Sequence, residues 1–156
     1  MPTRHAGIRK KRGIDLKRNA SAVWQGGLKD GKGSISTASG VLSNTQYSFS
    51  TRFEDGIGTN PEELIAAAHA GCFSMALSGQ LGNAGMTAES IETTATVTLD
   101  KTDAGFTITE VHLNVKVRIP GADQAAFDTA AANAKAGCPI SRVLNTKITM
   151  EASLEA

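Results

Sequence analysis

The chain has 156 residues, of which 40% are hydrophobic and 20% charged, with a formal net charge of +1 at pH 7. These values describe one ordinary soluble globular domain. No run approaches the roughly 18 apolar residues that span a bilayer, and the first residues lack the apolar stretch of a secretory signal. We therefore expect a cytoplasmic protein without a membrane partner.

Positive charge is concentrated at the start of the chain. Seven basic residues lie within the first 18 positions: Arg4, Arg9, Lys10, Lys11, Arg12, Lys17 and Arg18. Such an arm can bind phosphate backbones, which makes a nucleic-acid accessory protein one alternative. The arm has no interleaved aromatic residues, however, so we predict a disordered leader over residues 1–18, no nucleic-acid partner, and a single domain over residues 19–156.

Residues 20–53 are expected to form an antiparallel meander. Short β-prone runs alternate with glycine-rich turns, and the predicted strands cover residues 22–24, 34–37 and 46–53. In the last strand, Tyr47, Phe49 and Phe53 share one face. Arg52 then lies on the opposite face, where a solvated side chain is the simplest interpretation.

A long helix is predicted to begin after Asn60 and to end near Leu81. Asn60 can cap the helix, Pro61 suits its first position, and Glu62 is favoured by the helix dipole. At 100° per residue, Cys72 falls on the most apolar seam of this helix. We therefore expect Cys72 to be largely buried, with a raised pKa, and to react only if a cation lies close to it.

The second half repeats the order of strands followed by a helix. Strands are expected over residues 91–99, 106–119 and 146–153, with a helix over residues 123–136. The phase of alternation changes inside the second of these strands, which predicts a β-bulge near Thr109 and Glu110. The fold class is therefore α+β, with mainly antiparallel sheets and two main helices, and an intertwined homodimer is plausible.

Cys138, the second of only two cysteines, follows Gly137 and precedes Pro139. Gly137 can end one helix in a left-handed cap and Pro139 can begin another, which puts Cys138 at an N-cap that favours its thiolate. A need for a small residue between Gly and Pro is the alternative. In the cytoplasm a lasting disulfide is unusual, so the two cysteines act transiently, bind metal, or stay as inert thiols.

A structural zinc-binding module is the main rival from another class of protein. His69 and Cys72 are three residues apart on one helix and could ligate a metal jointly. Cys138 and His112 would complete the site, but these two are not closely spaced in the sequence.

Four stretches of the sequence resemble the OsmC/Ohr family, in particular its osmotically inducible OsmC branch. They are residues 47–54, 58–64, 70–77 and 135–141. The likeness covers about residue 22 to the C-terminus and leaves out the basic leader. It implies an OsmC-like fold in an intertwined homodimer, with active sites between the subunits.

The resemblance also implies an activity and a role for each matching residue. It implies a thiol peroxidase that reduces organic hydroperoxides, and hydrogen peroxide less efficiently, without a metal or bound cofactor. Cys72 resembles the peroxidatic cysteine and Cys138 the resolving cysteine. Arg52 looks like the arginine that activates the former, and Glu62 like the carboxylate that orients Arg52. The implied reductant is an external dithiol, dihydrolipoamide or a lipoylated protein.

The helix that carries both Glu62 and Cys72 sets a geometric condition on these roles. Ten residues at about 1.5 Å each separate the two positions by roughly 15 Å, which is more than one guanidinium can bridge. Either the regular helix begins after Glu62, or the active-site partners come from different subunits. We expect the second arrangement.

Overall fold

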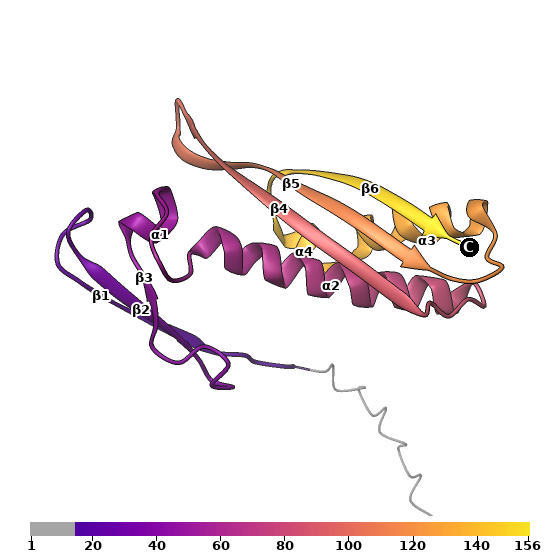
Figure 1. The fold of residues 1–156 in the computed structure, drawn as a ribbon, viewed down its shortest axis with the longest axis horizontal. Coiled ribbons are helices and arrows are strands. Elements are labelled where there is room, and N and C mark those ends of the chain that lie inside the picture. Colours follow the sequence, from indigo (N-terminus) through magenta and orange to yellow (C-terminus); the bar gives the residue numbers. More distant parts are fainter. Residues whose placement is uncertain (1–14) are drawn as a thin grey trace, which may run out of the picture.

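A computed structural model describes residues 15–156, which form two three-stranded sheets and four helices (Figure 1). In chain order the elements are β1 (Ala20–Gln25), β2 (Lys32–Thr37), β3 (Thr45–Tyr47), α1 (Phe49–Phe53), α2 (Pro61–Asn83), β4 (Ser90–Thr102), β5 (Gly105–Arg118), α3 (Gln124–Gly137), α4 (Pro139–Val143) and β6 (Lys147–Glu155). Most of the predicted basic leader lies outside the described residues, so that prediction stays open.

The second sheet has the strand order β4-β5-β6. β4 and β5 form a long antiparallel hairpin, and the pairing shifts by one residue where Thr98 faces Glu110 but Leu99 faces Ile108. Thr109 is the extra residue, so the predicted β-bulge is confirmed. β6 runs parallel to β5, because the chain crosses over through α3 and α4 before it returns to the sheet.

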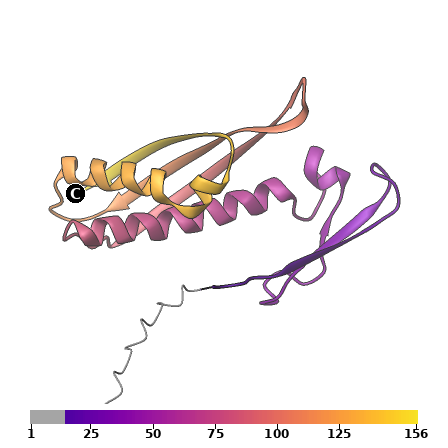
Figure 2. The same ribbon diagram turned by 180° about the vertical axis from the view of Figure 1, so that it is seen from behind.

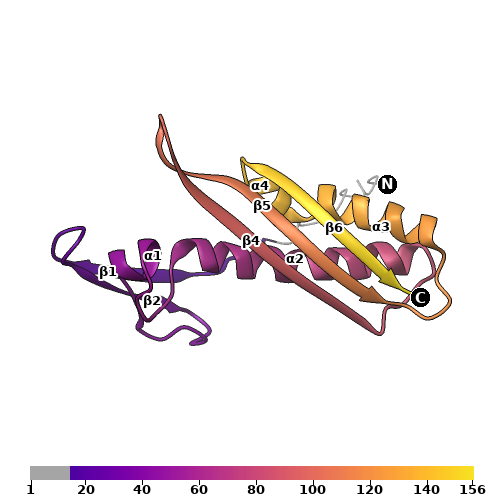
Figure 3. The same ribbon diagram turned by 45° about the horizontal axis from the view of Figure 1, so that its top comes forward.

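The hydrophobic core lies between this sheet and the helices α2 and α3. Side chains alternate along β5, so its helix-facing positions Val111, Leu113, Val115 and Val117 are buried. They pack in one cluster with Phe73, Leu77 and Leu81 of α2 and with Phe127, Ala130, Ala131 and Ala134 of α3. The opposite face of the sheet carries polar residues, and no described element covers it (Figure 3).

The first sheet is attached to this body in a different way. β1, β2 and β3 form an antiparallel meander that projects beyond the N-terminal end of α2 (Figure 1). Every residue of β1 is exposed, and Val23 is 57% exposed. Trp24 packs against Tyr47 with 5.4 Å between the ring centroids, and the short helix α1 packs against the meander at β3, but the first strand stays exposed along its whole length.

The predicted third strand over residues 46–53 is wrong beyond Tyr47. Ser48 starts helix α1 with a reciprocal cap: its side chain accepts from the Thr51 backbone N–H, and its own N–H donates to Thr51 Oγ1 at 2.8 Å. This capping box satisfies two backbone donors locally and outweighs the alternating pattern. Arg52 therefore lies on a short helix and not on a strand.

Helix α2 begins and ends close to the predicted limits, but its buried face is not the predicted one. His69, Phe73, Leu77 and Leu81 form the buried seam, whereas Cys72 is only half-buried and Met75, about one turn after it, is 79% exposed. By length and composition alone α2 could also cross a membrane, although no long uninterrupted apolar run was expected. In the structure one side of this apolar surface packs on the sheet and on α3, as Figure 2 shows from behind.

Candidate active site

The two cysteines meet where α2 contacts the junction of α3 and α4. The Sγ atoms of Cys72 and Cys138 are 3.0 Å apart, and no disulfide joins them. Cys138 is 0% exposed and belongs to the core. Cys72 is only half-buried, because it lies at the border between the core-facing side of α2 and its open side. Cys138 thus stands behind Cys72 as seen from the surface.

The chain places Cys138 by stopping one helix and starting another at the same residue. Cys138 is both the C-cap of α3 and the N-cap of α4, and Pro139 takes the first position of α4. Gly137 remains helical and has no positive φ, so the predicted left-handed cap is wrong. The extended ψ of 125° at Cys138 makes the break instead, as expected for a residue before proline.

The surroundings of the two sulfurs make the thiols unequal. Burial raises the pKa of the Cys72 thiol, its hydrogen bond with Cys138 adds to the rise, and the backbone N–H of Ile140 only partly opposes it. Burial also raises the pKa of Cys138, but the contact with Cys72 and the nearby polar groups of Ser141 and Ile140 outweigh it and lower the pKa overall. Cys138 is therefore the more acidic thiol of this chain, and Cys72 needs an added cation.

A second polar contact lies beside the sulfurs and was missed from the sequence. His69 Nε2 is 2.8 Å from Ser141 Oγ, although the residues are 72 positions apart. His69 is 0% exposed, and burial lowers its pKa. One signal in the sequence could have indicated this pair. His69 lies three residues before Cys72, and Ser141 lies three residues after Cys138.

Arg52 and Glu62 form an ion pair at the N-terminal end of α2. Glu62 Oε1 accepts from Arg52 Nη2 at 2.7 Å and from Nε at 3.0 Å, and Oε2 lies 3.3 Å from Nε. The Glu62 side chain is 11% exposed and that of Arg52 39%. No residue within 15–156 bonds Nη1, so this edge of the guanidinium is available to another group.

The cap of α2 fixes the relative position of the two ion-pair partners. Asn60 Oδ1 accepts from the Glu63 N–H at 2.8 Å, while Asn60 Nδ2 donates to the Thr51 carbonyl at 3.0 Å. One side chain therefore ties α2 to α1. Gly58 allows the tight connection, because its φ of 139° and the close Gln46 carbonyl leave no room for a side chain.

The four predicted site residues thus form two pairs that a single chain does not unite. Glu62 belongs to the regular part of α2, so it lies about 15 Å along the helix axis from Cys72. Because Arg52 is bonded to Glu62, the guanidinium is held at the far end of the helix. Of the two arrangements considered from the sequence, the helix that begins after Glu62 is excluded, because Glu62 lies within α2.

An apolar cavity of about 290 Å³ adjoins Arg52. Its lining combines one cation with a mostly aromatic wall: Trp24, Leu28, Tyr47, Ser48, Phe49, Arg52, Phe53 and Pro61. The Arg52 guanidinium carbon lies 5.3 Å from the centre of the Phe53 ring. Phe53 in turn packs against Phe106 at the tip of the β4–β5 hairpin, with 4.7 Å between centroids. The cavity can hold an apolar group whose polar end faces a guanidinium.

The alternative zinc site is not assembled. His112 bonds Thr149 through Nδ1 at 2.7 Å, and it alternates with Val111 and Leu113, which face the core. It therefore points to the outer face of the sheet, away from Cys138. Within residues 15–156 there is no group of three or more His, Cys, Asp or Glu side chains arranged to hold a metal ion.

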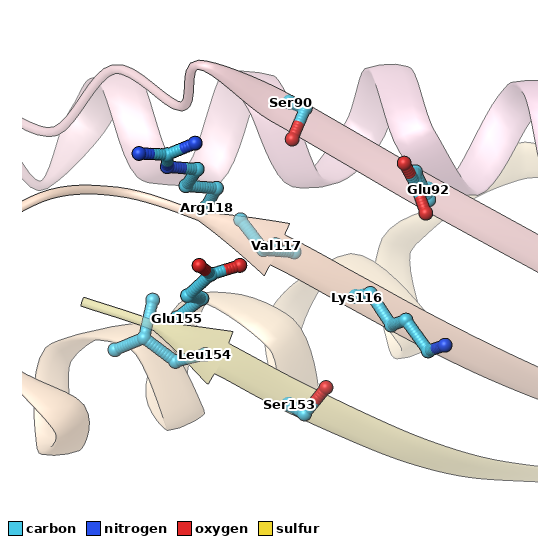
Figure 4. Close-up of a pocket in the computed structure, with 8 residues that line it drawn as sticks. All are labelled: Ser90, Glu92, Lys116, Val117, Arg118, Ser153, Leu154 and Glu155. Atoms are coloured by element: carbon cyan, nitrogen blue, oxygen red, sulfur yellow. The ribbon is translucent and has the colours of Figure 1, made fainter.

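A second cleft, of about 190 Å³, lies on that outer face of the sheet (Figure 4). Figure 4 shows Glu92 on β4, Lys116 and Arg118 on β5 and Glu155 on β6. Arg118 pairs with Glu89 at 3.2 Å, and both side chains are 56% exposed. Exposed charges of both signs with a solvated ion pair are typical of an ordinary surface. This cleft contains neither cysteine.

Known proteins of similar sequence and fold match the chain over most of its length. A family model described as OsmC-like protein matches residues 54–153. "Peroxiredoxin OsmC" from Escherichia coli (strain K12) is 55% identical over 143 residues, which are 92% of this chain and 100% of that protein. The protein of the same name from Shigella flexneri matches with the same identity and coverage.

Solved structures show the same fold at low sequence identity. An OsmC-like protein from Mycoplasma pneumoniae has a TM-score of 0.71 at 15% identity, over 92% of this chain and 100% of that one. The organic hydroperoxide resistance protein OhrB of Bacillus subtilis has a TM-score of 0.62 at 24% identity, over 88% of this chain and 98% of that one. At such low sequence identities, these similarities show only that the α+β fold is shared.

Proposed function

This chain belongs to the OsmC family and is a cysteine-based peroxidase, and we propose that it reduces organic hydroperoxides through a sulfenic acid on Cys72 that Cys138 resolves. The contact of 3.0 Å between the two sulfurs is the observation that carries this proposal. No atom lies between the two sulfurs. A substrate can approach Cys72, because this thiol is only half-buried.

The reaction balances in two steps that use only the peroxide and the two thiols. The Cys72 thiolate attacks the distal oxygen of the hydroperoxide, the O–O bond breaks, and the alkoxide leaves as an alcohol after taking up a proton. The Cys138 sulfur then attacks the Cys72 sulfenic acid. The S–S bond forms, the S–O bond breaks, and the hydroxide takes the Cys138 proton and leaves as water.

The raised pKa of Cys72 requires a cation, and Arg52 supplies it in this proposal. A guanidinium stays charged, stabilises the thiolate and donates to the departing alkoxide. Glu62 orients Arg52 through the three short contacts between their side chains. Since Arg52 is held about 15 Å from Cys72 along α2, we assign it to the Cys72 of a second copy in an intertwined homodimer.

Two features of the single chain support this dimer. The side of α2 next to Cys72 is open and lined by small or apolar residues, including Ala68, Gly71 and Met75. A methyl group added at Gly71 would find no atom within 4 Å. Val23 and Trp24 of the β1–β3 sheet are exposed in the single chain, and a partner surface would bury this apolar area. Each copy offers the surface that the other lacks.

The cavity next to Arg52 supports organic hydroperoxides as the preferred substrates. Its aromatic wall, with Trp24 and Phe49, can hold an apolar tail while the peroxide group lies at the guanidinium. Hydrogen peroxide has no tail to bury, so it gains less binding energy and reacts less efficiently.

An external dithiol must then reduce the disulfide. The dithiol is itself oxidised to a disulfide, and both cysteines return to thiols. We propose dihydrolipoamide or a lipoylated protein as this reductant, acting in the cytoplasm, where disulfides are transient. No bound metal or organic cofactor takes part in either step.

Stopped-flow kinetics tests the proposal with cumene hydroperoxide and hydrogen peroxide as substrates. We expect wild type to react faster with the former, and Cys72→Ser to lose the reaction with both. Cys138→Ser is expected to react once and then to gain two or three oxygens on Cys72, visible as added mass. A Cys72→Ser variant as fast as wild type would refute the mechanism. A Cys138→Ser variant without the first turnover would reverse the two roles.

A further inference from the structure

The wall of the cavity next to Arg52 contains the only tryptophan and the only tyrosine of the chain. Trp24 lies on β1 and Tyr47 lies on β3. Their ring centroids are 5.4 Å apart, and the rings are tilted by 54°. The two strands are not neighbours in the sheet, because β2 lies between them. The contact between the rings therefore passes over a whole strand.

The strand between the rings has no side chain at this level. Trp24 and Tyr47 both pair with Gly33 of β2, so the three residues form one rank across the sheet. Neighbouring strands lie about 4.8 Å apart, which puts the backbones of β1 and β3 roughly 10 Å apart. Side chains of one rank stand beside one another on the same face. A side chain at the central position would therefore stand between the two rings.

Space is the reason for glycine at this position, and backbone conformation is not. The φ of Gly33 lies outside the left-handed region that favours glycine. A Cβ atom added at Gly33 would clash with the ring of Tyr47 and would lie only 2.8 Å from Trp24 Cε3. Glycine inside a strand weakens a sheet and often marks the close approach of another group. Here the groups that approach are the two rings.

The next rank on the same face has the opposite arrangement. Ile35 occupies its centre, and its flanking residues are the smaller Ala22 on β1 and Thr45 on β3. A bulky centre keeps its neighbours apart, whereas the empty centre at Gly33 lets its neighbours meet. The joined aromatic wall is thus confined to one level of the sheet, and this level lines the cavity next to Arg52.

We propose that Gly33 is a positioning residue that sets substrate specificity: by letting Trp24 and Tyr47 meet, it makes the cavity selective for hydroperoxides with an aromatic tail. This inference rests on the proposed function and concerns the choice of tail. The indole N–H of Trp24 donates to the Gly26 carbonyl at 3.2 Å, which holds this ring in place before a substrate binds. An aromatic tail can make edge or stacking contacts with the two tilted rings, and a small alkyl tail cannot.

Two hydroperoxides that differ in a single group isolate the contribution of the wall. Cumene hydroperoxide carries a phenyl ring where tert-butyl hydroperoxide carries a methyl group. Stopped flow on the full chain gives the rate constant of sulfenic acid formation with each, and the ratio of the two constants measures selectivity. We expect Gly33→Ala to lower this ratio roughly five- to tenfold, the size of one lost aromatic contact. Trp24→Leu and Tyr47→Leu should lower it similarly, whereas Tyr47→Phe keeps the ring and should keep the ratio.

Ser34→Thr is the matched control for Gly33→Ala. It also adds one methyl group to β2, but Ser34 follows Gly33 in the strand and therefore lies on the opposite face of the sheet. There it lines a different cavity, with Val23 and Gln46. The ratio of the two rate constants in Ser34→Thr should equal that of wild type.

Trp24 also reports binding directly, because it is the only tryptophan that contributes to the fluorescence of the chain. Cumyl alcohol, the unreactive product from cumene hydroperoxide, should change the emission of wild type at lower concentrations than that of Gly33→Ala. A methyl group that only disturbed the sheet would lower both rate constants equally and would leave their ratio unchanged.

The outcomes separate this inference from the proposed function. An unchanged ratio in Gly33→Ala overturns the inference, and so does an equal fall in Ser34→Thr, because the sheet and not the rings is then responsible. If Gly33→Ala does not fold, unchanged ratios in both Trp24→Leu and Tyr47→Leu overturn it instead. A wild-type protein that forms no sulfenic acid with either hydroperoxide refutes the proposed function itself, whatever the fluorescence shows of the wall.

Discussion

The body formed by α2 to β6 and the part before it differ in how they bury their side chains. The body has a continuous core, in which Phe73 and Phe127 are both 0% exposed. The earlier part, from β1 to α1, has a sheet whose first strand is exposed throughout. The cysteines lie in the self-sufficient body, whereas Arg52 lies in the part that lacks a cover.

This division indicates how activity is linked to assembly. A nucleophile with a raised pKa reacts poorly until a cation reaches it, and the proposed cation, Arg52, is carried by the part whose first strand is exposed in a single chain. Under the proposed function we therefore expect Cys72 to react poorly in a single folded chain. In the proposed homodimer, pairing of two chains would complete the active sites and cover the exposed β1–β3 sheets at the same time.

The largest expected effect is that of removing the cation. Arg52→Ala should lower the rate of the first step by roughly a hundredfold or more, the usual loss when one preorganised charged donor is removed from a reacting centre. The rate of sulfenic acid formation measures this. Arg118→Ala is the matched control, since Arg118 also pairs with a glutamate but lies on the outer face of the sheet. Similar losses in both variants would contradict the assigned role.

The pH dependence of the Arg52→Ala variant should follow the raised pKa of Cys72. The thiolate is the reactive form, and a raised pKa makes it scarcer at neutral pH. The residual rate should therefore rise about tenfold per pH unit until the pH exceeds the ordinary range of thiol pKa values. Wild type should level off at lower pH, because the guanidinium favours the thiolate. If the pH profiles of the variant and wild type coincide, Cys72 does not need a cation to form its thiolate.

Mixing two inactive variants tests whether the site joins two chains. Arg52→Ala and Cys72→Ser homodimers should each be inactive, and subunit exchange should restore about a quarter of the wild-type activity, because half of the dimers are mixed and each has one complete site of two. Activity after mixing is the measurement. The Arg52→Ala/Cys72→Ser double variant, mixed with Cys72→Ser, is the inactive control. Without any restoration, Arg52 and Cys72 would have to act within one chain.

The smallest expected effect concerns the open side of α2. A methyl group at Gly79 meets nothing within 4 Å in the single chain, so Gly79→Ala would stabilise an uncovered helix by roughly 1 kcal/mol. Against a second copy the methyl is an extra group in a packed interface, and we expect self-association to weaken by about 1–3 kcal/mol. Sedimentation and thermal unfolding measure the two effects. A gain in stability with unchanged association would mean that this side of α2 stays bare.

Local signals in the sequence predicted most of the helices and strands. Asn60 and Pro61 marked the start of α2, and the change of phase near Thr109 marked the β-bulge, because caps and alternation are properties of neighbouring residues. The error at residues 48–53 has the same origin: the capping box between Ser48 and Thr51 is a local signal as well, and the alternating aromatic residues obscured it.

By itself, the sequence determined that Cys72 and Cys138 lie in helical settings suited to thiol chemistry and that their surroundings resemble one family. Only the tertiary structure decided that the sulfurs touch, that Cys138 is the more acidic thiol, that His69 reaches Ser141, and that Arg52 is held away from Cys72 in one chain. Each of these depends on contacts between residues far apart in the sequence. Such contacts are set by how α2 packs against α4 and α1, and no local pattern encodes that packing.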